Sequence, residues 1–355
     1  MTQFRPAPLA AGLLAAALAF ATPARADGAR GTAYVSNQDG DISVIDIASL
    51  AVVATIDAED KAPRGIGITG DGKLLVTANR DGGDISVIER ASGKVIRHIK
   101  IGKNPEFVRI LGDHAFISFE PSAKGGPPPK GGAKPPEKDD DGDREPAKIA
   151  VVDLRQMKLI RQITSGPETE GIEFAPDGKR MLVTNEADNT VTLHDIGSGK
   201  LVKTVSTEKY GNRPRGIKVS PDGRHYVVSL EYGDNFLVLD DKLNPVKAVP
   251  TGKTPYGISF DRAGGRLFVA ASKEKKLQVF DAKSFEKIAE MPTGDRCWHF
   301  SFTPDDAQIL LACGRSNDIH VFDAQTYAPV KQIGGKNLPW GVVTWPKSMG
   351  SLDRP

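Results

Sequence analysis

This 355-residue sequence contains seven repeated units, and a side chain that could bind a ligand stands at the same position in each of them. That position comes just before a regularly spaced residue, here called the anchor. The seven side chains are Arg64, Glu106, Glu170, Arg215, Tyr256, Trp298 and Trp340. Four charged residues come first and three aromatic ones follow. If the seven units close into a ring, one half of its mouth is charged and the other half is aromatic. Such a pocket suits a ligand with a flat or apolar face and polar groups at one edge.

A purely structural interpretation of these residues stays open. Arg64 with Glu106, and Glu170 with Arg215, could be neighbouring ion pairs, while the aromatic residues plug a central channel. The sequence does not decide between a plugged channel and a half-charged, half-aromatic binding pocket.

His299 is the one histidine at an anchor position, so it is the candidate for a catalytic base or a haem ligand. No Ser or Cys nucleophile motif and no Cys-x-x-Cys-His haem site accompanies it. We therefore expect a histidine packed in the channel at the pocket edge. The other histidines lack metal-ligand spacing and are interpreted as structural: His98, His114, His194, His225 and His320.

Acidic residues near the same mouth raise the question of a metal. The residues that follow the second strand of each unit are Gln38, Arg80, Glu120, Glu186, Glu231, Ser272 and Gly314. Their three acids, with Glu106 and Glu170, could offer hard oxygen ligands to Ca²⁺. Solvated loop acids are commoner than metal ligands, so we predict no bound metal.

Cys297 and Cys313 are the only cysteines. One begins the first strand and the other ends the second strand of the same unit, with a turn at Asp305-Asp306 between them. The two residues then fall opposite each other, at a distance that a disulfide can span. We predict a disulfide, with two buried thiols as the alternative.

The elements that position these residues are short strands in a repeated unit. The anchors are Gly65, Phe107, Gly171, Gly216, Gly257, His299 and Gly341, at spacings of 42, 64, 45, 41, 42 and 42 residues. The copy at 213–240 shows the unit most clearly, with alternating apolar residues on both sides of Asp222-Gly223. Four strands per unit of about 40 residues are typical of a β-propeller blade.

The two chain ends together supply one more unit. Residues 33–56 give three strands without a first one, and residues 340–344 give a first strand with nothing after it. Joined, they complete a blade and close the ring without exposed edges. We therefore predict an all-β fold, a seven-bladed propeller with four-stranded antiparallel blades, closed by strands from both termini.

The N-terminal residues 1–26 are expected to be a secretory signal peptide, with an apolar run from Leu9 to Phe20 and cleavage after Ala26. Residues 27–355 then form one propeller domain that is periplasmic or secreted. Cleavage removes two of the 47 basic residues and no acid, which leaves 45 basic and 45 acidic ones. A chain of zero net charge without a basic stripe is not expected to bind nucleic acid, and no later apolar run could span a membrane. We expect a monomer.

One spacing is longer because residues 121–147 are inserted between the second and third strands of a unit. This segment is rich in Gly, Pro and charged residues, cannot bury a core, and is expected to be a disordered loop over the mouth.

Several motifs resemble those of the YVTN-family β-propellers: Tyr34-Val-Ser-Asn37, Leu75-Val-Thr-Ala-Asn79 and Leu182-Val-Thr-Asn185, with the Pro-x-Gly-Ile and Pro-Asp-Gly-Lys framework around them. The exported, seven-repeat form is similar to members associated with pyrroloquinoline-quinone-dependent alcohol catabolism. It is more distantly similar to the propeller of cytochrome cd-type nitrite reductases. Phe107 and His299 depart from the family's glycine at the anchor.

Together these features favour an exported, non-catalytic propeller that binds a small ligand or a periplasmic protein partner at the channel mouth. The resemblance places it in alcohol or quinone-cofactor metabolism. Two alternatives stay open: a lactonase-like hydrolase with a metal at Glu106 and Glu170 and His299 as base, and a propeller that carries a haem or quinone near His299. No cofactor is predicted.

Overall fold

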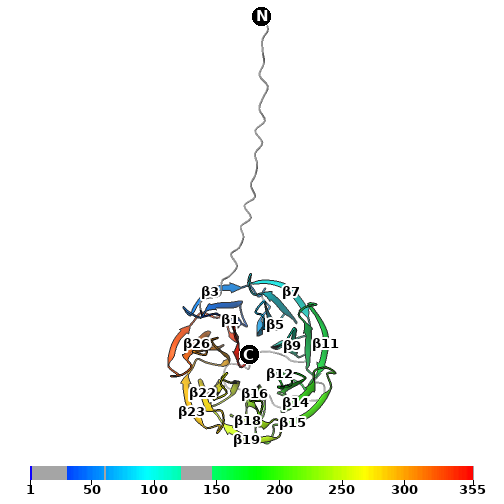
Figure 1. The fold of residues 1–355 in the computed structure, drawn as a ribbon, viewed down its shortest axis with the longest axis vertical. Helices are drawn as coiled ribbons and strands as arrows, with labels where there is room; N and C mark the ends of the chain where they lie inside the picture. Colours follow the sequence, from blue (N-terminus) through cyan, green and yellow to red (C-terminus); the bar gives the residue numbers. More distant parts are fainter. Residues whose placement is uncertain (2–29, 60, 121–145, 355) are drawn as a thin grey trace.

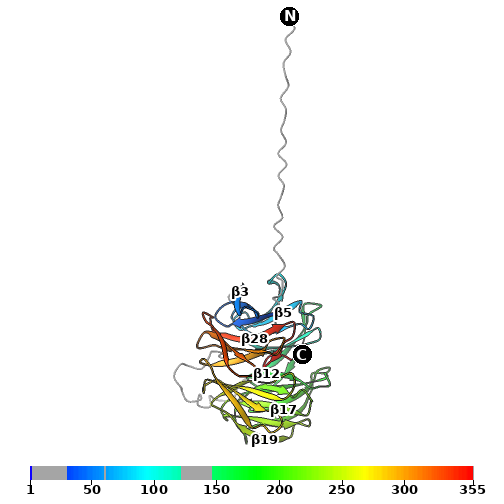
Figure 2. The same ribbon diagram turned by 60° about the vertical axis from the view of Figure 1, so that its left-hand side comes forward.

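The computed structural model describes residues 1, 30–59, 61–120 and 146–354. Within these ranges the chain forms 29 β-strands and no helix. The strands make seven sheets arranged as blades around a central channel (Figure 1, Figure 2). The predicted seven-bladed propeller is confirmed. The expected signal peptide, apart from Met1, lies outside the described residues.

Six blades follow one another along the chain, each running from the innermost strand at the channel to the outermost strand. Blade 1 contains β4 (Pro63–Ile68), β5 (Leu74–Asn79), β6 (Asp84–Glu89) and β7 (Lys94–Lys100). Blade 2 contains β8 (Pro105–Leu111), β9 (His114–Phe119), β10 (Lys148–Asp153) and β11 (Lys158–Thr164). Blade 3 contains β12 (Thr169–Phe174), β13 (Arg180–Asn185), β14 (Thr190–Asp195) and β15 (Leu201–Ser206).

The second half of the ring repeats this order. Blade 4 contains β16 (Pro214–Val219), β17 (His225–Leu230), β18 (Asn235–Asp240) and β19 (Pro245–Pro250). Blade 5 contains β20 (Pro255–Phe260), β21 (Arg266–Ala271), β22 (Lys276–Asp281) and β23 (Lys287–Pro292). Blade 6 contains β24 (Cys297–Phe302), β25 (Gln308–Cys313), β26 (Asp318–Asp323) and β27 (Pro329–Ile333).

The closing blade joins the two ends of the chain, as predicted. Its inner strand is β28 (Pro339–Trp345), followed by β1 (Thr32–Asn37), β2 (Ile42–Asp46) and β3 (Ala51–Ile56). Tyr34 of β1 lies opposite Val343 of β28 in an antiparallel ladder. The inner edge of β1 is therefore paired rather than exposed.

The burial pattern follows the radial position of each strand. In blade 4 every residue of β16 is buried, whereas β19 exposes all its residues except Val249. Apolar side chains on facing blades pack together; Phe236 of β18, for example, contacts Phe280 of β22 with ring centroids 5.1 Å apart. The core therefore lies between the blades, and the hydrophobic effect holds the ring together.

Glycine at the anchor positions follows from crowding around the channel. A Cβ atom on Gly216 would lie 2.7 Å from the Tyr256 carbonyl oxygen of the next blade, and one on Gly65 would lie 2.5 Å from that of Glu106. The two anchors that are not glycine, Phe107 and His299, come from blades 2 and 6. Their rings meet edge to face at a centroid distance of 5.9 Å and fill the channel between them.

The segment after β28, residues 346–354, is here called the C-terminal tail, and its strand β29 (Met349–Gly350) was not anticipated from the sequence. β29 pairs with β24 and gives blade 6 a fifth strand inside the ring. In Figure 1 this last described segment, in red, lies at the centre of the ring. The tail occupies the channel.

The insertion lies between β9 and β10, in the loop that the spacing predicts. Residues 121–145 lie outside the described residues. Pro146 is exposed and Ala147 is buried, with its carbonyl accepting a hydrogen bond from the Ser165 amide at 2.9 Å. Within the described ranges no helix is long and apolar enough to cross a membrane.

Candidate ligand-binding site at the channel mouth

A β-bulge aims the predicted site residues at the channel. In blades 1 to 6 the register between the inner strand and its neighbour shifts around the residue before the anchor, for example between Pro214 and Ile217. A bulge bends the strand and redirects the side chain of its extra residue. The residue just before this segment has a positive φ, such as 63° at Arg213 and 58° at Thr254. Each blade therefore has the same turn at the point where its inner strand begins beside the channel.

Arg215 is the centre of the charged half. Its guanidinium forms ion pairs with Glu170, Glu186 and Glu231, with Nε 2.6 Å from Glu231 Oε2. All four side chains are buried. Arg215 also lies over the ring of Tyr256, with Cζ 4.7 Å from the centroid. One cation therefore joins three acids to the aromatic half of the mouth.

Two further arginines surround this centre. Arg213 reaches Glu168 at 3.1 Å, Glu186 at 2.7 Å and Glu231 at 3.1 Å. Arg296 reaches Glu231 at 3.2 Å. Arg213 is partly exposed and lies over the exposed ring of Tyr232, 5.5 Å from its centroid. Glu168, Arg213 and Arg296 form the outer layer of the same network, on its solvent-facing side.

The acids of the mouth differ in charge state. Burial raises the pKa of Glu170, but the charge of Arg215 and the hydrogen bonds with Glu186 and Tyr256 together outweigh it and lower that pKa to about 2. Burial raises the pKa of Glu186 well above its ordinary value, even though Arg213 and Arg215 oppose the shift. Glu186 shares a hydrogen bond with Glu170, so we interpret it as the protonated donor to an ionised Glu170.

On the other side of the charged half, Arg64 pairs with Glu106 at 3.0 Å. Glu120 accepts a long hydrogen bond of 3.4 Å from the Asn104 amide. Burial raises the pKa of both acids, with Glu106 adding to the shift at Glu120. Their environment therefore favours the neutral carboxylic acid more than water does.

The aromatic half is closely packed. The ring of His299 lies 4.3 Å from that of Trp340 and 5.5 Å from that of Tyr256, measured between centroids. Trp298 belongs to the same buried cluster, and Gly314 is required beneath it because a Cβ there would overlap the indole. Trp340, Tyr256 and Trp298 are at most 4% exposed.

A hydrogen bond with the C-terminal tail positions the imidazole of His299. Its Nδ1 lies 3.0 Å from Ser351 Oγ, whereas its Nε2 is buried without a hydrogen-bond partner in the described chain. Burial lowers the pKa of His299 to about 3, although the charge of Glu170 opposes the shift. The imidazole is therefore neutral near pH 7, and aromatic rings enclose it on three sides.

The structure brings all eight predicted residues together at one end of the channel and reproduces the division into a charged and an aromatic half. Both sequence interpretations retain support. The ion pairs and the buried rings agree with a plugged channel. However, several buried polar atoms at this end have no hydrogen-bond partner among the described residues: Gln38 Nε2, Arg64 Nε, Asn104 Oδ1, Thr254 Oγ1, Arg296 Nε and His299 Nε2.

Sequence reasoning missed the outer layer formed by Glu168, Arg213 and Arg296. The signal was available, because all three lie three residues before an anchor, at the positive-φ position. It also missed Ser351, whose segment belongs to no repeat.

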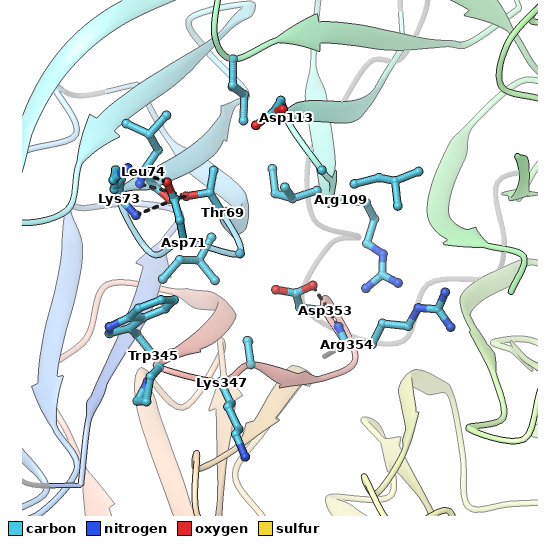
Figure 3. A pocket seen from close by; sticks show the side chains of 18 of the residues that line it. Thr69, Asp71, Lys73, Leu74, Arg109, Asp113, Trp345, Lys347, Asp353 and Arg354 are labelled. Atoms are coloured by element: carbon cyan, nitrogen blue, oxygen red, sulfur yellow. Dashed lines mark hydrogen bonds and ion pairs between the residues drawn. The ribbon is translucent and has the colours of Figure 1, made fainter. Parts of the chain in front are cut away.

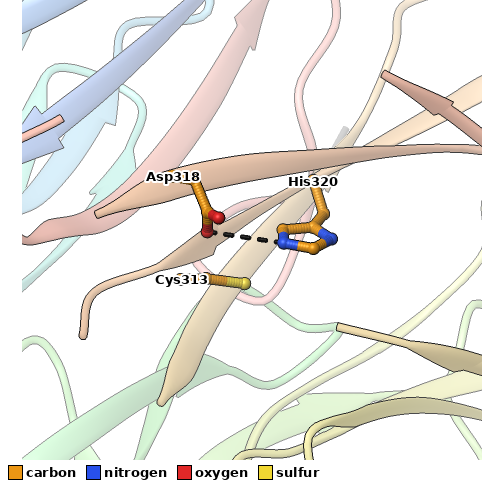
Figure 4. Close-up of side chains that lie close together, drawn as sticks. All are labelled: Cys313, Asp318 and His320. Atoms are coloured by element: carbon orange, nitrogen blue, oxygen red, sulfur yellow. Dashed lines mark ion pairs between the residues drawn. The ribbon is translucent and has the colours of Figure 1, made fainter. Parts of the chain in front are cut away.

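The predicted disulfide partners are joined in the structure. Cys297 and Cys313 lie opposite each other in the β24–β25 ladder, with Sγ atoms 2.05 Å apart. Cys313 also lies beside Asp318 and His320 (Figure 4), and among described residues these three form the one group close enough to share a metal ion. Because its sulfur is bonded to Cys297, only two donors of this group are free to bind a metal.

Glu106, Glu170 and His299, the set considered for a metal-dependent hydrolase, do not form such a group. Glu170 is engaged by Arg215, and His299 Nδ1 by Ser351. In this arrangement their donor atoms are not placed to bind one ion together.

Two family models match parts of the chain: the YncE-like β-propeller family over residues 12–116 and the seven-bladed β-propeller lactonase family over residues 171–285. The uncharacterized protein YncE of Salmonella typhimurium is 26% identical over 215 residues, which cover 58% of this chain and 53% of YncE. The chain thus matches about half the length of that relative. Protein NirF of Stutzerimonas stutzeri is 21% identical over 303 residues, which cover 78% of this chain and 71% of NirF.

Among solved structures, the periplasmic gluconolactonase PpgL of Pseudomonas aeruginosa superimposes with a TM-score of 0.71 at 15% identity, covering 88% of this chain and 98% of PpgL. That likeness concerns the fold. The chain is a seven-bladed β-propeller related to the YncE-like and lactonase seven-bladed β-propeller families and homologous to YncE and NirF.

Proposed function

We propose that this chain is an exported β-propeller binding protein that recognises a small ligand or a periplasmic partner protein at the channel mouth. Its ligand would have a flat or apolar face and polar groups at one edge. The resemblance to propellers of alcohol and quinone-cofactor catabolism suggests an accessory role in that metabolism. The periplasmic location named for the gluconolactonase of the same fold is consistent with export.

One observation carries this proposal: buried polar atoms that have no hydrogen-bond partner among the described residues gather around a buried ionic network. Burying charges costs several kcal/mol for each ion, and the mutual attraction of the ions often does no better than apolar packing would. A channel that only needed a plug could therefore be filled equally well by apolar side chains. Perturbed carboxylates beside unsatisfied donors are instead typical of a binding site.

The outer layer is the part of the mouth that a ligand meets first. Arg213 and Glu168 are partly exposed, and Tyr232 is exposed. A polar group on the ligand could exchange hydrogen bonds with this layer, while its flat face approaches Tyr232.

The test uses the whole protein and an extract of its native host. Wild-type protein is incubated with the extract, washed and examined by native mass spectrometry for a retained small molecule or protein. We expect the double variant Trp340→Ala, Arg215→Ala to lose the retained species. Because both residues are buried, Arg213→Gln serves as a milder variant that should weaken retention without unfolding the chain.

Arg224→Gln is the matched control, because Arg224 is an exposed arginine in the turn at the opposite end of blade 4. It should retain the species as the wild type does. If the folded mouth variants retain as much as this control, the assignment of the site is wrong.

A lactonase-like hydrolase is the second candidate, because a seven-bladed lactonase family model matches residues 171–285. Hydrolysis of glucono-δ-lactone, followed by acid release with and without added divalent metal ions, tests it. Metal-dependent turnover that is lost in Glu170→Gln would favour the hydrolase, and the absence of turnover above the buffer rate would exclude this substrate.

A further inference from the structure

A cavity of about 980 Å³ opens at the other end of the channel, away from the mouth. It lies between the β4–β5 turn, the β8–β9 turn and the C-terminal tail, and is here called the tail cavity (Figure 3). The mouth residues begin the inner strands, whereas these turns follow their last residues. The two sites are therefore separate. The volume is of the size that holds a small organic molecule.

The tail cavity has an apolar part. Trp345 lies on one side in Figure 3, across from Arg109 and Arg354. Ile110, Leu111 and Phe174 add apolar lining. The indole of Trp345 is partly exposed and contacts the turn at Gly72, where a Cβ would overlap it. Arg90 lies over the Trp345 ring, with its Cζ 5.0 Å from the centroid. A planar ligand would stack on the part of this fixed indole that Arg90 leaves open.

Basic residues exceed acidic ones in the lining. Two pairs toward the rim neutralise each other: Lys73 with Asp71 at 3.2 Å, and Arg155 with Asp113 at 2.5 Å. This leaves Arg109, Arg354 and Lys347. Arg109 and Arg354 both reach the buried Glu173, at 2.6 Å and 3.6 Å, and Asp353 is the remaining acid of the lining. Lys347 is exposed and has no carboxylate within 4.0 Å in the described chain.

Arg109 supplies the observation that points to a ligand. It is 2% exposed, its Nη1 donates to the Leu352 carbonyl oxygen, and its Nη2 donates to Glu173 at 2.6 Å. Its Nε has no hydrogen-bond partner among the described residues. An unpaired N–H on a buried guanidinium that lines a cavity favours an acceptor in that cavity.

The environment of Asp353 favours its protonated form. Its carboxylate accepts a hydrogen bond from the Arg354 amide at 2.9 Å, and burial raises the pKa to about 6 in spite of Arg109. The groups that face it are Arg109 of β8, Glu173 of β12, Lys218 of β16 and Arg354 of the tail. When Asp353 takes up a proton, the arginines lose an internal counter-charge.

We propose that the tail cavity binds a small organic carboxylate with a flat apolar body. The carboxylate would lie beside Arg354 and Arg109, where charge-assisted hydrogen bonds replace the missing acceptor, and the exposed Lys347 would add positive charge to the lining. The apolar body would pack on Trp345. This site is independent of the channel mouth and of any ligand bound there.

The experiment titrates the full-length folded protein with 2-naphthoate by isothermal titration calorimetry. The uncharged 2-naphthalenemethanol is the matched probe for the apolar contribution. We expect naphthoate to bind at least about tenfold more tightly than the alcohol, which is the effect of one charge-assisted contact. Arg354→Gln should remove that preference, and Trp345→Leu should weaken both probes.

Two control variants separate this site from others. Arg224→Gln, an exposed arginine in a turn at the same end of the ring, should bind naphthoate as the wild type does. Arg213→Gln, at the mouth, should also leave naphthoate binding unchanged, so failure at one site is distinguishable from failure at the other. Binding that disappears equally in Arg224→Gln or Arg213→Gln would overturn the proposal.

A pH series adds a second readout. Naphthoate should bind more tightly at about pH 5 than at about pH 7.5, because Asp353 is protonated at the lower pH. Asp353→Asn should bind at about pH 7.5 as tightly as the wild type does at about pH 5. No detectable binding of naphthoate up to millimolar concentration, or equal affinity for naphthoate and the alcohol, would overturn the proposal.

Discussion

Arg215 contacts three buried acids, and the pKa values of two of them, Glu170 and Glu231, are lowered. Removing one member of a buried ion pair costs about 3–5 kcal/mol, because the remaining charge is left without a partner. We therefore expect Arg215→Met to lower the free energy of unfolding by about that amount, measured by urea titration near pH 7.

A second substitution distinguishes lost charge pairing from lost packing. Glu170→Gln removes the acid whose pKa Arg215 lowers most clearly. The double variant Arg215→Met, Glu170→Gln should then be more stable than Arg215→Met alone. If the two substitutions change the free energy of unfolding by amounts that simply add, the two charges are not coupled.

His299 makes stability depend on pH in a defined window. Its pKa is about 3 in the folded chain and about 6.5 when unfolded, so the unfolded chain binds the proton first as the pH falls. The stabilising contribution is complete above about pH 6.5 and is lost progressively toward pH 3. At about pH 4.5 the loss is about 2–3 kcal/mol.

His299→Asn tests this, since the asparagine amide can keep the contact with Ser351. The wild type should lose about 2–3 kcal/mol more than this variant between about pH 7 and pH 4.5, in urea titrations. His114→Asn, at a partly exposed position, should fall in parallel with the wild type. If the free energy of unfolding of His299→Asn fell with pH as much as that of the wild type, His299 would not be a buried, neutral imidazole.

At the scale of elements, the disulfide links β24 to β25 within blade 6. It closes a loop of 16 residues, and such a loop contributes about 3 kcal/mol through the unfolded chain. Adding a reductant to the folded protein should lower the free energy of unfolding by about that amount. Chelator must be present, because reduction would free the Cys313 sulfur beside Asp318 and His320.

The variant Cys297→Ser, Cys313→Ser is the control and should not respond to reductant. Thiol labelling confirms that reduction of the wild type is complete. An unchanged urea midpoint after full reduction would mean that the bond does not stabilise the fold.

The inner strands could be predicted from the sequence because each carries the same short pattern. Alternating apolar residues and Asp-Gly turns determine strands such as β16 and β17, and the residue before the anchor marks the position that enters the channel. β29 could not be predicted in this way. It has two residues, and its stability comes from β24 and from the space that the ring leaves, which no local pattern records.

At the scale of the whole molecule, the repeat gives the order of the blades and therefore the division of the mouth into two halves. The repeat does not show how closely the side chains at the mouth pack against one another. Whether Trp340 and Tyr256 line an open pocket or fill the channel depends on the anchor residues of other blades, such as Phe107 and His299, which meet across the axis. The tail cavity depends in the same way on a segment outside the repeat.

The pairing of β1 with β28 also sets the order in which the molecule can be completed. β1 leaves the ribosome well before its partner β28, because about 300 residues separate Asn37 from Pro339. At ~10 residues per second that is a delay of ~30 s. During this time β1 has an open edge that can pair with other chains. We expect a nascent chain to need a chaperone until its last blade is made.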